Sequence, residues 1–330
     1  MKRYWSLGDL PLGGPRRVVA IGTFDGVHLG HREVIAQARD RADRRGRSLM
    51  VVTFEPNPVS VLRPGLSPAV ITPVEFKAAL IGALDVDELL VIPFTRAFAR
   101  IRAERFVEML ASAPIGADAI VVGQNFRFGH GGAGTVDTLN RVGRACGLEV
   151  TSPGIVTAGG DKPVSSTRIR RLIVAGDVRE AAVLLARPHS IEGPVVEGAH
   201  RGRGMGFPTA NVDIPRTAAL PARGVYAGLV TTRGGQWAAA INVGFAPTFE
   251  GDVQLGARPR VEAFLLDYDG PELYDARARV AFQERLRDEQ RFDGPEQLAA
   301  QIQDDVRRAR EIAGAAATGA AGPSARVARD

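Results

Sequence analysis

The stretch RRVVAIGTFDGVHLGHREVIAQARDRADRRG, residues 16–46, decides the fold of the first half of the chain. It opens with a short β-branched run over 16–22, which is typical of a buried strand. A glycine-rich turn follows, and the next residues have the pattern of a helix that Gly46 ends. A strand, a turn and a helix in this order form the repeating unit of a parallel sheet flanked by helices.

The same alternation continues through the first half. The segments SLMVVTF, LLVIPF and DAIVVG predict further strands, and PVEFKAALIGAL, AERFVEMLA and TVDTLNRVGRACG predict the helices between and after them. SSTRIRRLIVAG and DVREAAVLLA predict two short helices at the end. We therefore expect an α/β domain with a parallel sheet over residues 1–186.

The pattern changes near Arg187. Short runs broken by glycine and proline follow, namely SIEGPVVEG, GVYAGLVTT, QWAAAINVG, PRVEAFLLD and ARARVAF. Several of them alternate apolar and polar residues, which favours an antiparallel β-barrel. The amphipathic segment PEQLAAQIQDDVRRAREIAG predicts one terminal helix. We expect a barrel domain over 187–314 and a disordered low-complexity tail over 315–330.

The composition is that of an ordinary globular protein, with 330 residues, 45% hydrophobic and 24% charged. No apolar run reaches about 18 residues, and the first residues lack the apolar core of a signal peptide, so we expect a cytoplasmic protein. The single cysteine, Cys146, fits no metal cluster and is expected to be a packed thiol. The formal charge of +5 comes mostly from arginine, which suits phosphates. Nucleic acid would also suit this charge, but no basic–aromatic pattern supports it.

Two of the five histidines, His28 and His31, lie in GTFDGVHLGH (22–31), where the first predicted helix starts. Residues three apart share a helix face, and helix N–H groups favour anions. Gly30 has no side chain to keep a phosphate away. Both imidazoles can then donate to phosphoryl oxygens during an in-line displacement. A pair of surface or N-cap histidines is the alternative, and Asp25 either serves the nucleotide or holds the turn.

A second segment of this half is VSSTRIRR, residues 164–171. Ser165, Ser166 and Thr167 can cap a helix and donate hydroxyl groups. Arg168 offers a planar fork to a triphosphate. The alternative is an ordinary cap followed by a basic, solvated helix face.

Together, GTFDGVHLGH, VVGQNFRFG and SSTRIR resemble the nucleotidyltransferases, and more closely the FMN adenylyltransferase half of the bacterial bifunctional FAD synthetases. This resemblance implies a Rossmann-like domain in which His28 and His31 stabilise the α-phosphate of ATP. It also implies that SSTRIR holds the leaving pyrophosphate and that Asn125 contacts FMN. The ATP contacts implied in this half are Gly22, Phe24, Asp25, Gly30, Ser165, Ser166, Thr167 and Arg168.

Two positions depart from the family pattern. Asn57 in TFEPNP stands where a histidine is common, and His130 follows FRFG where a basic residue is common. Both departures leave the detailed contacts to FMN or ATP open. Gly129, Gly131 and Gly134 spell GxGxxG, but they do not follow a strand directly and no acid has the required spacing. A nicotinamide-dependent oxidoreductase is therefore disfavoured.

The segment GAHRGRGMGFPTANV, residues 198–212, is glycine-rich and basic, yet it lacks the GK[ST] of a Walker A loop. Small residues over 202–206 allow backbone N–H groups to approach phosphates. Thr209 and Asn211 lie two apart, so an extended chain places them on one face. Their oxygen atoms suit Mg²⁺. A flexible hairpin with a structural Pro-Thr turn is the alternative.

This segment and LPARGVYAG, NVGFAPTF, VEAFLLDYDG and RLRDEQRFDGPEQLAAQIQDDV follow one another in the order seen in riboflavin kinases. The resemblance implies a six-stranded barrel, Mg-ATP binding by Thr209 and Asn211, and Glu262 as the general base. Independently, Glu262 lies in an otherwise apolar strand, where scarce solvent makes a carboxylate a better base. The alternative is a solvent-facing glutamate beside Arg260. Further implied contacts are ATP at Gly204 and Gly206, and flavin at Arg285 and Arg287, for which a solvated face is equally open.

Both halves together are similar to the prokaryotic riboflavin kinase/FMN adenylyltransferases. The resemblance implies phosphorylation of riboflavin to FMN with ATP and Mg²⁺, and adenylylation of FMN to FAD with release of pyrophosphate. One alternative is that only one activity is live and the other domain binds flavin or nucleotide without turnover. Another is a regulatory flavin- or nucleotide-binding module. The expected partners are riboflavin, FMN and ATP, without nucleic acid or membrane, and a homo-oligomer is left open.

Overall fold

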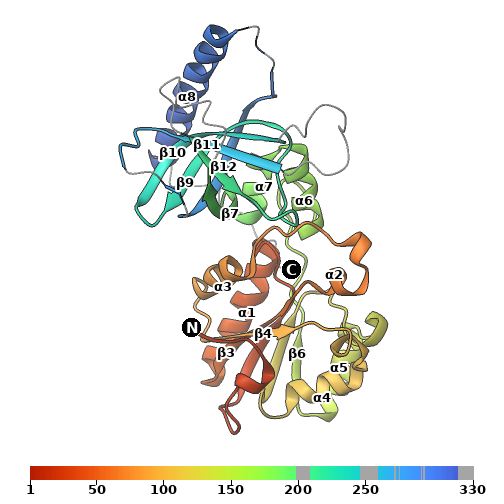
Figure 1. The fold of residues 1–330 in the computed structure, drawn as a ribbon. Coiled ribbons are helices and arrows are strands. Elements are labelled where there is room, and N and C mark those ends of the chain that lie inside the picture. The colour runs from red at the N-terminus through yellow and green to blue at the C-terminus, as the bar shows by residue number, and fades with distance from the viewer. Residues whose placement is uncertain are drawn as a thin grey trace. The chain divides into compact units, whose positions relative to one another are not determined.

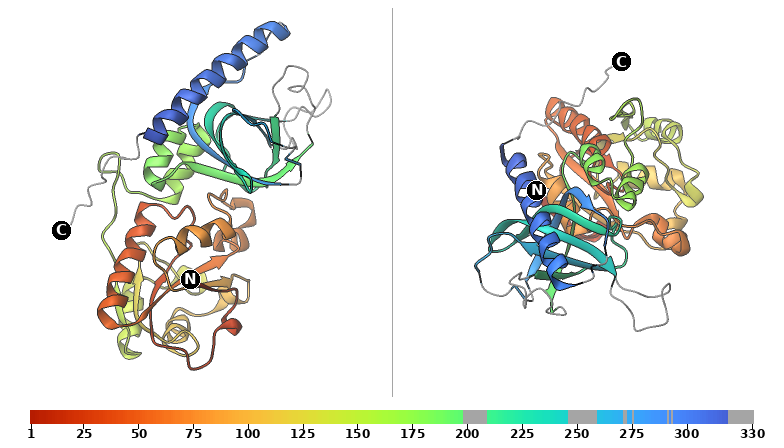
Figure 2. Two further views of the ribbon diagram at one scale, coloured as in Figure 1. Left: turned by 90° about the vertical axis from the view of Figure 1, so that its left-hand side faces the viewer. Right: turned by 90° about the horizontal axis from the view of Figure 1, so that it is seen from above.

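The chain folds into two compact units, drawn in Figures 1 and 2. The computed structural model describes residues 1–197, 209–245, 259–270, 273–274, 276–290, 292 and 294–318. The first unit comprises Met1–Pro68 and Thr72–Ser165, and the second comprises Ala69–Ile71 and the described residues from Ser166 onward. Residues 166–186 thus belong to the second unit, because most of their contacts are with it. The sequence boundary between 186 and 187 stays a prediction.

The first unit contains the expected parallel sheet, in the order β1-β4-β3-β2-β5-β6. All of its strand pairs are parallel. The strands are β1 (Lys2–Tyr4), β2 (Arg17–Ile21), β3 (Ser48–Glu55), β4 (Glu88–Pro93), β5 (Ala117–Val122) and β6 (Glu149–Thr151).

Helices cover both faces of this sheet. They are α1 (Leu29–Arg45), α2 (Pro58–Leu62), α3 (Val74–Gly82), α4 (Ala103–Ala111) and α5 (Val136–Ala145), with 3-10 turns η1 (Leu7–Asp9), η2 (Pro64–Leu66), η3 (Phe98–Arg100) and η4 (His130–Gly132). In β2, Val18 and Ala20 pack in one core cluster with residues of α1 and α3. Val19 and Ile21 pack in the other cluster, with residues of α4 and α5. The strand alternates faces, so a continuous apolar run serves both layers.

The strand order places a topological switch point between β2 and β5. The chain passes from β2 to β3 and β4 on one side, and β5 and β6 lie on the other. In open α/β sheets, ligands bind outside the carboxyl ends of the strands at such a point. The loop after β2 contains the two histidines, and the loop after β5 contains QNFRFG. The fold therefore brings both segments to the carboxyl edge of neighbouring strands.

The second unit contains the expected antiparallel barrel, closed in the order β10-β11-β8-β7-β12-β9. The left view of Figure 2 looks into it. Two helices precede it and one follows it. The elements are α6 (Ser166–Ala175), α7 (Val178–Leu185), β7 (His189–Val196), β8 (Thr209–Asp213), β9 (Gly224–Thr232), β10 (Gly235–Phe245), β11 (Pro259–Leu265), β12 (Arg277–Arg287) and α8 (Pro295–Thr318). Helix α8 continues past residue 314, where the sequence predicted its end.

Helix α8 lies against the outside of the barrel. Its Ala309 is buried in a cluster with Val225, Ala227 and Leu286 of the strands. A buried ion pair fixes the helix further, because the Arg287 guanidinium of β12 donates to both carboxylate oxygens of Asp305, with distances of 2.8–3.1 Å. No helix in the described part of the chain is long and apolar enough to cross a membrane.

The barrel also encloses a neutral histidine. His189 is 1% exposed, its Nε2 donates to the carbonyl of Ala219 at 2.7 Å, and its ring stacks on Phe282. Burial lowers the pKa of His189 from 6.5 to about 4, although the bond to Ala219 opposes this.

The lowered pKa of His189 predicts that the folded protein loses stability in mild acid. Between the two pKa values the unfolded chain binds the proton and the folded chain does not, so stability rises with pH in this window. Protonation should therefore remove up to about 3 kcal/mol as the pH falls from 6.5 to 4. Thermal unfolding of the wild type and His189→Phe across this range measures it. The variant should be less stable at pH 7 but should lose less stability on acidification, and parallel curves would contradict the prediction.

Candidate functional site

The loop after β2 is held by backbone and side-chain hydrogen bonds from the neighbouring strand. The amide of Gly22 donates to the carbonyl of Val52 at 3.1 Å. The hydroxyl of Thr53, which is fully buried, donates to the carbonyl of Thr23 at 3.1 Å. The loop therefore leaves the sheet in a fixed direction before helix α1 begins.

Three residues of this loop have left-handed backbone conformations. They are Phe24 (φ 48°), Gly26 (φ 93°) and Val27 (φ 42°). A left-handed β-branched residue costs about 1–3 kcal/mol and persists only where the surroundings impose it. The side chains of Phe24 and Val27 are buried in the core cluster with α1 and α3. Packing therefore imposes a conformation that the residue types alone would not choose.

His28 and His31 lie together, as their spacing predicted. Their rings stack with centroids 3.6 Å apart and an interplanar angle of 17°. His28 is the N-cap of α1, and its Nδ1 accepts from the His31 amide at 3.3 Å. A ring nitrogen that accepts a hydrogen bond carries no proton, so Nε2 of His28 is the nitrogen able to donate. His28 thus has the N-cap role that the alternative named, while the phosphate-facing role of the pair stays a prediction.

Gly30 lies against the ring of His28 and near the segment that leads to SSTRIR. An added Cβ would lie 3.3 Å from Cε1 of His28 and 3.7 Å from the carbonyl oxygen of Val164. The chain that enters SSTRIR therefore passes beside the histidine loop, and Ser165 follows directly. Ser166, Thr167 and Arg168 begin α6, which belongs to the second unit. Their contact with the same phosphates stays a prediction.

Asp25 is buried and accepts a hydrogen bond from the amide of Thr72 at 3.0 Å. This bond fixes the histidine loop to the segment before α3. The sequence left two roles open for Asp25, and this hydrogen bond supports the one in which Asp25 holds the turn. Its role toward a nucleotide stays a prediction.

The residue expected to contact FMN and the two positions that depart from the family pattern lie around the loops after β3 and β5. Asn125 is exposed in the turn after β5. Asn57 caps α2 by accepting from the amide of Val59 at 3.0 Å, so it has a local structural role. Nδ1 of His130 lies 3.3 Å from the carbonyl oxygen of Ala99.

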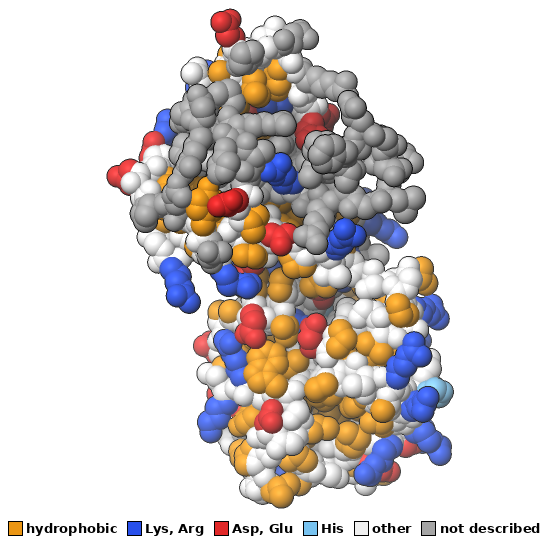
Figure 3. All heavy atoms as spheres, viewed as in Figure 1, with side chains coloured by type: hydrophobic (Ala, Val, Ile, Leu, Met, Phe, Trp, Pro, Cys, Tyr) orange, Lys and Arg blue, Asp and Glu red, His pale blue; other side chains and the backbone are white. Residues whose placement is uncertain are grey.

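Sequence reasoning missed an aromatic cluster in this unit. Its members are Phe54, Phe94, Phe98, Phe106, Phe126 and Phe128, which contact one another with ring centroids 5.5–6.2 Å apart. An adjacent apolar pocket of ≈430 Å³ is lined by Ile92, Phe98, Ile101 and Met109, among others. Figure 3 shows apolar side chains gathered over the first unit on the face of Figure 1. The phenylalanines of PFTRAF and NFRFG were the available signal, but only the fold brings them together.

The second unit has its own polar group on the outside of the barrel. Glu262 of β11 is the direct cross-strand partner of Asn211 on β8 and of Asn242 on β10. Nε of Arg260 lies 2.9 Å from Oε1 of Glu262 and donates to Oδ1 of Asn211 at 3.3 Å. Thr209 is exposed at the start of β8. The sequence did not single out Asn242.

The surroundings of Glu262 differ from those expected for an apolar strand. Val261, Ala263 and Leu265 point into the barrel core, and Glu262 points to the opposite face with Arg260. Its side chain is 33% exposed and ion-paired. The expected scarcity of solvent is therefore wrong, because a strand alternates its faces and only the odd positions fill the interior. The pairing with Arg260 is the arrangement that the alternative named, while the catalytic role stays a prediction.

The two arginines predicted for the kinase site make contacts with other groups than Glu262. Arg287 is bonded to Asp305 as described above. Nη2 of Arg285 donates to the carbonyl of Arg223 and lies 2.7 Å from Asp288. Contact of Arg285 or Arg287 with flavin stays a prediction. Gly204 and Gly206 lie outside the described residues.

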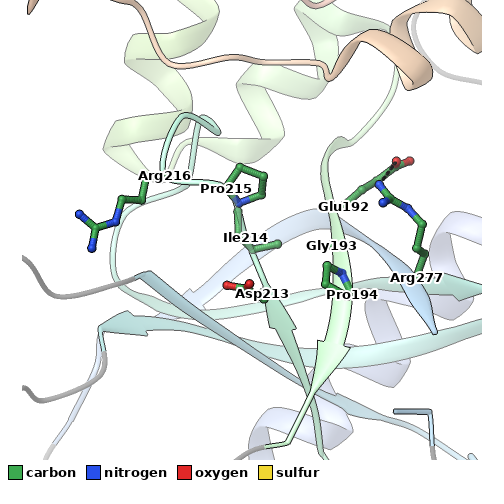
Figure 4. A pocket seen from close by; sticks show the side chains of 8 residues that line it. All are labelled: Glu192, Gly193, Pro194, Asp213, Ile214, Pro215, Arg216 and Arg277. Atoms are coloured by element: carbon green, nitrogen blue, oxygen red, sulfur yellow. Dashed lines mark ion pairs between the residues drawn. The ribbon is translucent and has the colours of Figure 1, made fainter. Parts of the chain in front are cut away.

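A further pocket lies where β7 and β8 run side by side, and it differs from both predicted sites. It has a volume of ≈340 Å³ and is lined by Glu192, Gly193, Pro194, Asp213, Ile214, Pro215, Arg216 and Arg277. Figure 4 shows the ion pair of Glu192 with Arg277, at 3.9 Å, and Arg216 extending away from the other labelled side chains. Its acidic and basic side chains balance, so the lining favours no charged ligand. Among the described residues, no group of three or more His, Cys, Asp or Glu side chains could hold a metal ion.

Two protein families match successive parts of the chain. The model of the FAD synthetase family matches residues 14–168, and that of the riboflavin kinase family matches residues 185–313. The first match includes the histidine loop and the beginning of SSTRIR. The second includes the whole barrel.

Proteins similar to nearly the whole chain are also known. The "Bifunctional riboflavin kinase/FMN adenylyltransferase" of Pseudomonas fluorescens is 37% identical over 296 residues, covering 90% of this chain and 93% of that protein. The protein of the same name from Bacillus subtilis is 35% identical over 300 residues, covering 89% and 92%. A crystal structure of a Streptococcus pneumoniae protein named macrolide-efflux protein is 30% identical, with a TM-score of 0.79, and covers 93% and 98%.

Proposed function

Since this chain belongs to the family of bifunctional riboflavin kinase/FMN adenylyltransferases, we propose that each unit performs one of the two reactions. The barrel phosphorylates riboflavin to FMN, and the α/β unit adenylylates FMN to FAD. The observation that carries this proposal is the joint presence of both families in one chain, each with its polar groups clustered in the fold.

In the α/β unit, a phosphate oxygen of FMN attacks the α-phosphorus of ATP, and the bond to pyrophosphate breaks. The attacking oxygen is already ionised at neutral pH, so the protein needs to position the reactants and stabilise charge. Nε2 of His28 and the ring of His31 are proposed to donate to the oxygens of the α-phosphate. The aromatic cluster and its apolar pocket have the chemistry that a flat flavin ring requires.

In the barrel, the 5′-hydroxyl of riboflavin attacks the γ-phosphorus of ATP, and ADP leaves. Glu262 is proposed to accept the hydroxyl proton. Thr209 and Asn211 carry oxygen atoms two residues apart on β8, which fits a hard divalent cation such as Mg²⁺ whose other ligands are phosphates. Oδ1 of Asn211 keeps a lone pair beyond the one that Arg260 uses.

One incubation of the purified chain with riboflavin and Mg-ATP tests the proposal. Chromatography should show FMN first and then FAD. FMN alone, or FAD only when FMN is added, would mean that just one unit is active. Binding of flavin or nucleotide without either product would favour a regulatory module and overturn the proposal.

A further inference from the structure

Lys77 is a buried amine that neither reaction above uses. It lies in the middle of α3 with its side chain only 6% exposed. Burial lowers the pKa of Lys77, and the negative charges of Glu55 and Asp25 oppose that shift. Removing an ammonium group from water costs several kcal/mol unless it is well compensated. A lysine in this position therefore calls for a reason beyond the packing of an apolar helix face.

The contacts of Lys77 converge on the histidine loop. Nζ donates to the carbonyl of Thr23 at 3.3 Å and lies 3.6 Å from Oε2 of Glu55. The same carbonyl accepts from the hydroxyl of Thr53. Two side chains, one from α3 and one from β3, thus hold the residue that directly precedes left-handed Phe24. Such a conformation persists only where several contacts impose it together.

The positive charge of Lys77 has a second role, because two acidic side chains lie near the same loop. Asp25 is part of the loop, and Glu55 ends the neighbouring strand β3. Two carboxylates near a loop that is to receive a triphosphate would repel it, since all of these groups are negatively charged. The ammonium group lies 3.6 Å from Glu55 and interacts electrostatically with Asp25, so it offsets the charge of both acids.

We propose that Lys77 is a positioning residue of the adenylyltransferase site: it holds the Thr23 carbonyl and offsets the charge of Asp25 and Glu55, so that the loop accepts a nucleoside triphosphate. The inference rests on the function proposed for this unit. Lys77 acts through the loop and does not itself touch the reacting atoms.

Two single variants separate the two tasks. Lys77→Met removes the tether and the charge at similar side-chain length, and Thr53→Val removes only the other tether to the same carbonyl. Hydrogen exchange of peptides covering residues 22–31 should become faster in both. The KM for ATP in FAD formation from added FMN should rise about tenfold or more in Lys77→Met and much less in Thr53→Val, because only the former leaves the acids unopposed.

A charge-rescue variant addresses the chance that Lys77→Met merely disturbs the fold. Adding Glu55→Gln to Lys77→Met removes one of the unopposed acids, so the KM for ATP should return part of the way to the wild-type value. Thermal unfolding of both variants separates this rescue from the repair of a structural defect, which would instead raise the stability along with the affinity. Riboflavin phosphorylation, measured on the same polypeptide, should stay at the wild-type rate throughout, because it depends on the barrel.

Unchanged loop exchange in Lys77→Met and Thr53→Val would overturn the inference, as would a KM for ATP within about twofold of the wild type in Lys77→Met. Failure of the proposed function gives a different result, since the wild type would then make no FAD from FMN and Mg-ATP. Loop exchange would still decide whether Lys77 positions the loop.

Discussion

Replacing Glu262 with glutamine is expected to slow riboflavin phosphorylation by about a thousandfold, while FAD formation from added FMN continues at the wild-type rate. Glutamine has nearly the same shape. Its amide oxygen can still accept from Nε of Arg260, which in the wild type pairs with Oε1 of Glu262. What disappears is a group that can take the proton of the attacking hydroxyl. Chromatography of the products from riboflavin and from FMN, in parallel, measures both rates.

Glu284→Gln is the matched control for this experiment. Glu284 lies on β12 of the same barrel, is 39% exposed and faces Arg179 at 3.7 Å, so it also belongs to a partly exposed ion pair. It should retain both activities. If Glu262→Gln keeps a kinase rate near that of Glu284→Gln, then Glu262 is a structural partner of Arg260 and the general base lies elsewhere.

His31→Ala is expected to have the opposite selectivity, lowering FAD formation by about a hundredfold to a thousandfold. The alanine removes the ring stacked on His28 and with it a donor proposed for the α-phosphate. The backbone amide that His28 caps remains, so helix α1 keeps its start. Riboflavin should still be phosphorylated, and FMN should accumulate.

The control for this variant is Asp40→Ala on the same helix. Asp40 is exposed and, among the described residues, forms an ion pair with Arg44 one turn along, so its loss should change neither reaction. Comparable FAD formation in His31→Ala and Asp40→Ala would contradict a role for His31 in the chemistry. If His31→Ala stopped both reactions in a folded protein, the assignment of two separate sites would be wrong.

Short-range patterns were enough to predict the architecture of each half. Periodicity and glycine positions predicted a parallel α/β sheet and then an antiparallel barrel, and both are confirmed. The shared face of His28 and His31 was predictable for the same reason, because residues three apart at a helix start lie on one side, whereas the stacking of their rings was not predicted. The residue types that form turns and the spacing of apolar side chains are local features, so they can be read from the sequence itself.

Properties that depend on contacts across the fold were not accessible in this way. Glu262 was expected to lack solvent because its strand neighbours are apolar, yet those neighbours fill the barrel and Glu262 faces outward to Arg260. The ion pair of Arg287 was not visible in the sequence either, because its partner Asp305 lies 18 residues further along, on a separate helix. The phenylalanine cluster collects side chains from segments that no local pattern connects.

The order of residues alone therefore determined the fold class of each half and the approximate place of most helices and strands, while the boundary between the two domains stays a prediction. The tertiary structure decided which polar groups meet, which are buried and which face water. Lys77 shows the difference most clearly: in the sequence it is one lysine in an apolar helix, and in the fold its amine reaches the carbonyl of Thr23. The physical reason is that burial and charge pairing depend on distances between residues far apart in the chain, and only the closed packing of the elements sets those distances.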